Sequence, residues 1–202
     1  MKIKLIFISG PSGSGKTTLS KQILGKIKNG IILSTDNYYK IGLISRLLSK
    51  LVKGYFDRSI SFDCKLFKKD FNFIVQNGIS INERSYNFEK KTISNFLKET
   101  NNINFLIIEG IFAKEFSNTL YNQNYFFLEL KINKNECMKR VVQRDLKERG
   151  KTRKQAEDDF FKSWNIYYEK CKNKNIKNNL KILTITQKTN IDQILKKLFN
   201  EF

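Results

Sequence analysis

The sequence predicts a three-layer α/β/α protein with a central five-stranded parallel sheet. Apolar runs and turn signals alternate as strand, helix, strand, helix, and this order favours parallel strands with helices on both faces. Five runs are rich in β-branched or aromatic residues, as buried strands are. They are Lys2–Ser9, Ile31–Ser34, Asn104–Glu109, Tyr125–Ile132 and Lys181–Thr186. With 202 residues, the chain is expected to form one domain, residues 1–202.

Helices are predicted between these strands. Leu19, Ile23 and Ile27 recur four apart, which predicts a helix over Thr17–Lys28 that ends at a left-handed cap, Asn29-Gly30. Further helices are predicted near Lys65–Asn77, from near Asn133, through Trp164, and over the apolar stripe Ile191, Ile194, Leu195 and Leu198.

Two segments interrupt the alternation, at about 35–100 and about 144–153. The first holds the helix near Lys65–Asn77, closed by Gly78, and then a polar, aromatic stretch that predicts a small β-ribbon. The second is highly charged and centred on Gly150. Inserts of this kind often carry binding sites and lids, so we expect an acceptor-site insert and a lid here.

The composition limits the classes of partner. The formal net charge is +19; a basic surface can bind nucleic acid, but we expect most of this charge to be solvated and the rest to attract anionic substrates. No apolar run reaches the ~20 residues that span a bilayer, and no signal peptide is evident, so a cytoplasmic protein without a membrane partner is expected. The cysteines Cys64, Cys137 and Cys171 have no paired spacing and histidine is absent, which argues against a disulfide framework and a zinc site.

The stretch GPSGSGKT, Gly10–Thr17, matches the P-loop pattern G-x-x-x-x-G-K-[ST] between a predicted strand and a predicted helix. Its glycines let successive backbone N–H groups point inward and bind phosphate at the helix N-terminus. Lys16 can then reach the β- and γ-phosphates, and the Thr17 hydroxyl can bind Mg²⁺. The expected nucleotide-binding residues are Gly10, Ser12, Gly13, Ser14, Gly15, Lys16, Thr17 and Thr18.

Two acidic residues follow predicted strands at the edge of the sheet that carries the P-loop. Glu109 ends one strand, where a carboxylate can organise the shell of Mg²⁺. Asp36 follows the strand that ends near Ser34, where an acid could accept the proton of an attacking hydroxyl. Taken alone, each could be a solvated carboxylate or a turn residue, but beside a P-loop we favour the functional roles.

Six segments in order resemble the uridine kinase family of P-loop nucleoside kinases, over Ile3 to about Ile185. They are GPSGSGKTT, STDNYYK, FDRSISFD, YNF, IIEGIFA and KRVVQRDLKERGKT. The resemblance implies a P-loop kinase that uses ATP or GTP with Mg²⁺ to phosphorylate the 5′-hydroxyl of uridine or cytidine.

The resemblance also implies roles on the acceptor side. Asp36 would be the general base and touch the magnesium shell, together with Thr17 and Glu109. Tyr39 and Asp57 would line the nucleoside pocket. Tyr86 and Phe88 would hold the base from the β-ribbon.

On the donor side, the resemblance implies that Arg144, Arg149 and Lys151 fold over the triphosphate as a lid and neutralise charge on the transferred group. The spacing of Asp145 and Arg149 is also that of an exposed salt bridge on a helix.

The sequence departs from the family pattern at three places, all on the acceptor side. Lys91 stands where the family has a base-reading His. Val141 replaces the second Arg of a pair, and Arg140 beside it could substitute as a substrate contact. Arg58-Ser59 replaces a His-Pro pair.

Two alternatives remain open at the level of the sequence. One is a kinase of the same fold that phosphorylates nicotinamide riboside, pantothenate or a sugar phosphate; Lys91 and Arg58 would suit an acceptor with an anionic group. The other is a nucleotide-binding regulator that associates with nucleic acid, which would explain the net charge of +19. The resemblance further implies that subunits could associate.

Overall fold

The computed structural model describes residues 3–87, 90–100, 102–117, 119–120, 125–172, 182–186 and 188–201. Its strands are β1 (Lys4–Ser9), β2 (Gly30–Ser34), β3 (Ser80–Asn87), β4 (Thr92–Glu99), β5 (Phe105–Glu109), β6 (Tyr125–Leu130) and β7 (Ile182–Ile185). Its α-helices are α1 (Lys16–Leu24), α2 (Leu43–Leu51), α3 (Cys64–Asn77), α4 (Ala113–Ser117), α5 (Lys134–Glu148), α6 (Arg153–Lys172) and α7 (Ile191–Glu201). Short 3₁₀ turns lie at Thr35–Asn37, Tyr55–Asp57 and Ser59–Ser61.

The predicted five-stranded parallel sheet is confirmed. Its strand order is β2-β5-β1-β6-β7, and every neighbouring pair is parallel. Ile8 of β1 and Ser34 of β2 both align with Glu109 of β5. Because parallel strands end at one edge, this register brings the P-loop, Glu109 and the turn with Asp36 together.

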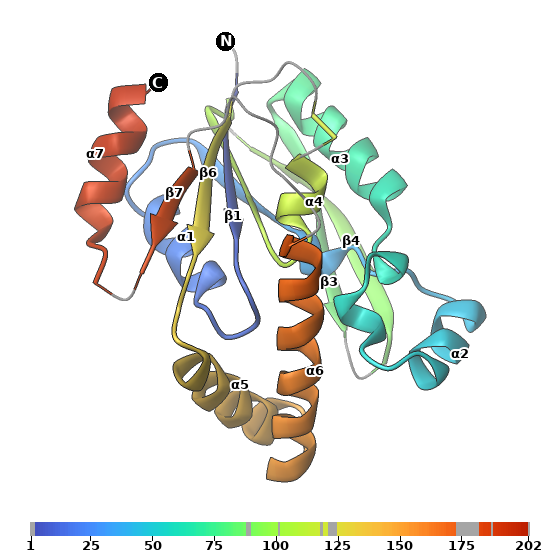
Figure 1. The fold of residues 1–202 in the computed structure, drawn as a ribbon. Coiled ribbons are helices and arrows are strands. Elements are labelled where there is room, and N and C mark those ends of the chain that lie inside the picture. The colour runs from blue at the N-terminus through green and yellow to red at the C-terminus, as the bar shows by residue number, and fades with distance from the viewer. Residues whose placement is uncertain are drawn as a thin grey trace.

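Alternate residues of the strands build a core on each face of the sheet. Phe7 packs on the side of α3 and α4, with Phe67 and Phe116, whereas Ile6 packs on the side of α1 and α7. Figure 1 shows these two pairs of helices on opposite sides of the sheet, which is the predicted three-layer arrangement. Apolar packing on both faces of the sheet therefore fixes the position of the sheet edge that carries the P-loop.

The predicted β-ribbon is also confirmed. Strands β3 and β4 form an antiparallel pair outside the main sheet. The buried carboxylate of Asp70 on α3 anchors the ribbon, because it accepts hydrogen bonds from Tyr38 Oη at 3.0 Å and Asn82 Nδ2 at 3.2 Å and pairs with Arg84.

The predicted end of the first helix was wrong. Helix α1 ends at Leu24 instead of Lys28, because the chain tightens after Gly25: the next N–H, that of Lys26, bonds to the Ile23 carbonyl at 3.0 Å, only three residues back. Asn29 is left-handed, with φ 54°, but it precedes β2 and does not cap the helix. The charged segment 144–153 begins inside a helix, since α5 continues to Glu148 and turns only at Gly150, with φ 60°.

Candidate active site

The P-loop wraps the N-terminus of α1 in a conformation that requires glycine. Gly13 and Gly15 have φ values of 77° and 92°, in the left-handed region that glycine adopts without strain. A Cβ on Gly13 would lie 2.4 Å from the carbonyl oxygen of Cys137. The loop is therefore packed directly against α5, which leads into the charged segment.

Lys16 lies inside this loop. Its side chain is buried, and its Nζ donates a hydrogen bond to the Pro11 carbonyl at 3.0 Å. Burial lowers the pKa of Lys16, while the carboxylates of Asp36 and Glu109 oppose this shift. The hydroxyl of Ser14 is buried and has no hydrogen-bond partner among the described residues, so the loop offers polar groups that fit a phosphate.

Oxygen ligands suited to Mg²⁺ gather beside the P-loop. Thr17 Oγ1 donates to Glu109 Oε2 at 3.3 Å, and Asp36 Oδ1 is a buried oxygen without a partner in the described part of the chain. Burial and the charge of Asp36 raise the pKa of Glu109, and Lys16 partly offsets this rise. Among the described residues, no three His, Cys, Asp or Glu side chains are grouped so that they could hold a metal ion by themselves. Two carboxylates and a hydroxyl fit Mg²⁺, which commonly keeps waters and binds substrate phosphates as well.

One cavity of about 360 Å³ joins the two halves of the predicted site. Ser12 of the P-loop lines it together with Asp36, Tyr39 and Asp57. Val141 and the lid cations Arg144, Arg149 and Lys151 complete this part of the wall. The structure therefore brings residues of the expected nucleotide side and of the expected acceptor side onto one open cavity of a size typical for small ligands.

The acceptor end of the cavity is fixed by hydrogen bonds and aromatic packing. Asp57 Oδ1 accepts a hydrogen bond from Ser163 Oγ at 2.7 Å, which joins the Tyr55–Asp57 turn to α6. Tyr39 is buried, and burial together with the charges of Asp36 and Asp57 raises its pKa. Tyr39 therefore remains a neutral phenol between two carboxylates.

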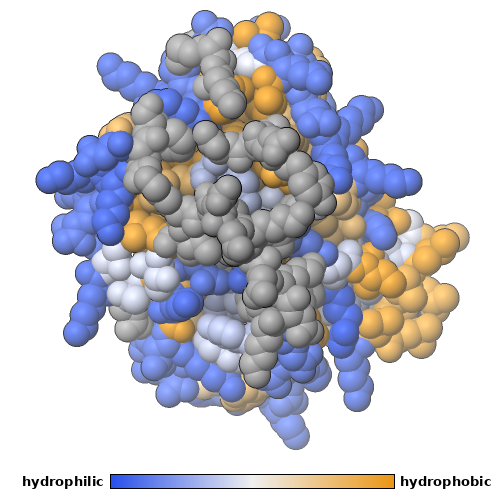
Figure 2. Space-filling view, turned by 45° about the horizontal axis from the view of Figure 1, so that its top comes forward, coloured by the Kyte–Doolittle hydropathy of each residue, from blue (hydrophilic) through white to orange (hydrophobic). Residues whose placement is uncertain are grey.

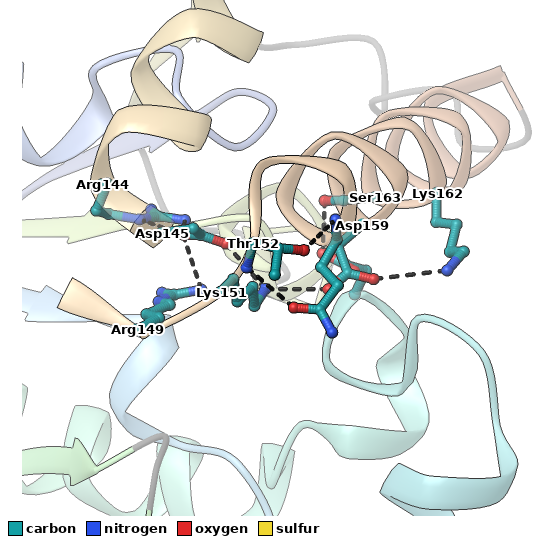
Figure 3. A network of polar contacts seen from close by, with 10 residues as sticks. Arg144, Asp145, Arg149, Lys151, Thr152, Asp159, Lys162 and Ser163 are labelled. Carbon is teal, nitrogen blue, oxygen red and sulfur yellow. Dashed lines mark hydrogen bonds and ion pairs between the residues drawn. The ribbon is translucent and has the colours of Figure 1, made fainter. Parts of the chain in front are cut away.

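The lid cations converge on one buried carboxylate. Asp145 accepts from Arg144 Nη2 at 2.8 Å and from Lys151 Nζ at 2.9 Å, and it pairs with Arg149 Nη1 at 3.5 Å. Figure 3 shows these three side chains turned toward Asp145. Burial would raise the pKa of Asp145, but the hydrogen bonds from Lys151 and Arg144 and the charge of Arg149 outweigh it, so the pKa lies below its ordinary value. The pair of Asp145 and Arg149 is thus part of a cluster of three cations around a buried carboxylate.

Local signals explain why Lys151 folds back onto α5. Gly150 takes the left-handed conformation that commonly follows a helix end. Two residues later, Thr152 and Gln155 exchange backbone-to-side-chain hydrogen bonds at 3.0 and 3.3 Å, which is the capping box that starts α6. The two helix ends hold Lys151 between them.

Other predicted acceptor residues lie elsewhere. Tyr86 is buried against Tyr39, with ring centroids 5.1 Å apart, and is not among the described residues that line the cavity. Arg140 donates to the Gly13 carbonyl at 3.4 Å; it lies one helical turn before Arg144, and this turn carries it to the P-loop instead of the cavity. Lys91 donates to Ser49 Oγ at 2.7 Å. Phe88 lies outside the described residues.

Part of the cavity wall was not predicted. The end of α2 and the residues after it contribute Ser49, Lys50, Val52 and Lys53, and α6 contributes Asp159, Lys162 and Ser163. The spacing of Leu47 and Leu51 could have revealed a helix here. It could not have shown that the end of this helix reaches the site.

The fold and the site together define a P-loop kinase. The solved structure of D-glycerate 3-kinase from Cryptococcus neoformans var. grubii has a TM-score of 0.65 to this chain at 13% identity, and the match covers 92% of this chain and 86% of that one. At this identity the likeness shows the fold alone.

Comparison of its sequence with known proteins assigns the chain to a family of P-loop kinases. The model of the Phosphoribulokinase / Uridine kinase family matches residues 5–182, so the chain belongs to this family. The chain is 29% identical to the uridine kinase of Borrelia duttonii over 82% of this chain and 79% of that protein. It is 26% identical to the uridine kinase of Macrococcus caseolyticus over 79% and 77%. The protein is therefore a phosphotransferase that acts on a hydroxyl group.

Proposed function

We propose that this kinase transfers the γ-phosphoryl group of ATP to the 5′-hydroxyl of uridine or cytidine. The observation that carries the proposal is a cavity lined by Ser12, Asp36, Asp57 and the cations Arg144, Arg149 and Lys151. It can hold a triphosphate end and a ribose end at once, with a carboxylate between them. The two relatives described above bear the name uridine kinase, which supports the same acceptor.

Groups in the cavity and in the P-loop beside it have distinct chemical tasks in this proposal. Asp36 accepts the proton of the attacking hydroxyl while the hydroxyl oxygen forms a bond to the γ-phosphorus. Lys16, Arg144 and Arg149 stabilise the charge on the transferred group and on the leaving ADP. Thr17, Glu109 and Asp36 would hold Mg²⁺, which supplies further charge neutralisation when bound.

Binding of the ribose is assigned to Asp57 and Tyr39. Asp57 keeps acceptor capacity beyond its hydrogen bond with Ser163, because a carboxylate offers about four lone pairs. Tyr39 supplies a flat, apolar ring beside it. The base would pack against the aromatic and apolar lining, Phe56, Ile111 and Val141.

A second acceptor class is favoured by one specific observation. Lys50, Lys53 and Lys162 line the same cavity as Asp57. Three ammonium groups on this wall would suit an acceptor that carries a carboxylate or a phosphate, such as pantothenate or a sugar phosphate. Arg58 and Lys91, which suggested such an acceptor from the sequence, contact the Lys53 carbonyl and Ser49 instead.

The deciding experiment is a coupled assay of ADP release with ATP and Mg²⁺. The acceptors are uridine, cytidine, adenosine, nicotinamide riboside, pantothenate and a sugar phosphate, and GTP replaces ATP in a parallel series. We expect turnover on uridine or cytidine, abolished in Lys16→Ala and retained in Lys21→Ala, an exposed lysine of the same helix. Turnover confined to the anionic acceptors would reject the first proposal in favour of the second.

A further inference from the structure

Helix α2 turns its apolar side away from the protein. The exposed fractions are 82% for Leu43, 76% for Ile44, 58% for Leu47 and 70% for Leu51, and Ile41 just before the helix is 55% exposed. These five residues are called the outer face of α2. Residues spaced three and four apart share one side of a helix, so the outer face forms one continuous apolar surface.

The side of α2 that contacts the protein carries serines. Ser45 is buried; its hydroxyl donates to the Lys40 carbonyl at 2.6 Å and accepts from Tyr55 Oη at 3.1 Å. One turn later, Ser49 Oγ accepts from Lys91 Nζ. This arrangement is the reverse of a usual surface helix, whose apolar side faces the core. Hydrogen bonds hold the helix in place, and Leu43, Leu47 and Leu51 remain more than half exposed.

The charge around the outer face has one sign. The segment 40–53 contains Lys40, Arg46, Lys50 and Lys53 and no acidic residue. The whole chain carries a formal net charge of +19. Lysine and arginine beside an apolar surface can extend their charged ends to anionic groups while their stems remain in apolar contact.

The outer face lies at an extremity of the molecule. Figure 1 places α2 at the right-hand edge, away from the main sheet. Figure 2 shows hydrophobic residues gathered at the same edge. A flat surface can reach a protruding helix of this kind without contact with the rest of the protein.

We propose that the outer face of α2 docks the kinase on an anionic membrane surface, with the helix lying in the plane of the interface. The apolar side chains would enter the region between headgroups and acyl chains, and Lys40 and Arg46 would contact lipid phosphates. No helix in the described part of the chain is long and apolar enough to cross a bilayer. Because α2 has only nine residues, the docking is weak and reversible.

The charge pattern favours a membrane over a second copy of this chain. Pairing two outer faces would bring Lys40 and Arg46 of one copy close to Lys40 and Arg46 of the other, without an acid from either 40–53 segment to compensate them. An acidic protein with an apolar groove would satisfy the same chemistry. A protruding convex helix and the net charge of the whole chain, however, suit an extended anionic plane better than a local groove.

Vesicle co-sedimentation of the full chain tests the proposal. We expect binding to vesicles of phosphatidylcholine with phosphatidylglycerol, and little binding to phosphatidylcholine alone. Leu43→Gln with Leu47→Gln should lower the partition coefficient at least about tenfold. Lys40→Gln with Arg46→Gln, or added salt, should lower it severalfold.

Matched variants separate docking from general adhesion. Phe96→Gln with Leu97→Gln alters two exposed apolar residues of β4, and Lys21→Gln with Lys26→Gln alters two exposed lysines; both should retain binding within about twofold of the original chain. Circular dichroism and the thermal midpoint check folding. Ile44→Gln with Leu51→Gln provides a second pair from the outer face if the first pair unfolds.

Several outcomes would overturn the proposal. The first is that the chain binds neither kind of vesicle, and the second is that it binds both equally. The third is that the β4 control loses as much vesicle binding as Leu43→Gln with Leu47→Gln. A concentration-dependent dimer in sedimentation equilibrium that Leu43→Gln with Leu47→Gln abolishes would assign the outer face to a second copy instead. Binding to an acidic protein in the absence of lipid, with no vesicle binding, would assign it to that partner.

Discussion

The buried carboxylate of Asp145 accepts a hydrogen bond from Lys151 Nζ at 2.9 Å, and this contact joins the middle of the lid to the last turns of α5. Arg144 and Arg149 share the same carboxylate. Three cations around one acid leave a net positive charge on the cavity wall, which suits a triphosphate. The cluster therefore holds Arg144, Arg149 and Lys151 together around Asp145.

Replacing Asp145 by Asn should destabilise the protein by roughly 1–3 kcal/mol. The loss of a buried partner leaves its cations uncompensated, but these cations are about a third exposed, so solvent screens part of the repulsion. Urea unfolding at pH 7 measures the change. Asp159→Asn, at a half-exposed carboxylate that also binds Lys151, is the control and should cost less than ~1 kcal/mol.

The stability that Asp145 contributes should depend on pH. Its pKa in the folded protein lies below the ordinary value, because hydrogen bonds from Lys151 and Arg144 outweigh the effect of burial. The contribution is therefore complete above the unfolded-state pKa, about 3.9, and it is lost as the pH falls through the lower folded-state pKa. The difference in unfolding free energy between Asp145→Asn and the original chain should be constant from pH 8 to about 5 and shrink below about 4. A difference that grows on acidification would contradict this account.

Asp36→Asn should lower turnover ~10²- to 10⁴-fold while ATP binding is nearly preserved. The substitution removes the group that accepts the proton but keeps the shape of the side chain. ADP release measures turnover, and calorimetric titration measures ATP binding. Asp158→Asn, at an exposed aspartate of α6, should leave both unchanged; unaltered turnover in Asp36→Asn would reject Asp36 as the base.

Glu109→Gln should raise the thermal midpoint in the absence of Mg²⁺ and reduce turnover. Burial and the charge of Asp36 raise the pKa of Glu109, so its ionised form costs stability above the unfolded-state pKa. In a chain of this size, 1 kcal/mol corresponds to about 2–4 °C. Thermal scans at pH 5 and pH 8 measure the difference in midpoint between the variant and the original chain. The variant should gain more at pH 8, and a lower midpoint in the variant at both pH values would contradict the account.

Asp57→Asn should raise the KM for the acceptor by roughly 10²-fold with little change in the KM for ATP, because the proposed ribose site would lose its carboxylate. Ser163→Ala removes the hydroxyl that holds Asp57 at 2.7 Å but leaves the carboxylate in place. Its effect on the acceptor KM should be smaller, about threefold to tenfold. Initial-rate kinetics with each substrate varied in turn distinguish the two, and a larger effect on ATP would place Asp57 on the donor side.

Local sequence patterns determined the framework of this protein. The strands, the P-loop and the β-ribbon were predictable because hydrophobic runs, glycine spacing and capping residues act over a few neighbours. The edge shared by Asp36, Glu109 and the P-loop followed from strand order, since parallel strands end on one side of a sheet. The family resemblance rested on the same short segments.

The tertiary structure alone decided how the segments face one another. Arg140 and Arg144 differ by one helical turn, and only the packing of α5 on Gly13 shows that the first contacts the P-loop while the second lines the cavity. Asp145 becomes the centre of the cation cluster because α5 and α6 meet there. Helix α2 exposes most of its leucines because its serines form the hydrogen bonds to the rest of the protein, with Lys40, Tyr55 and Lys91. Such contacts join residues far apart in the chain, so their partners depend on how whole elements pack and not on the local pattern.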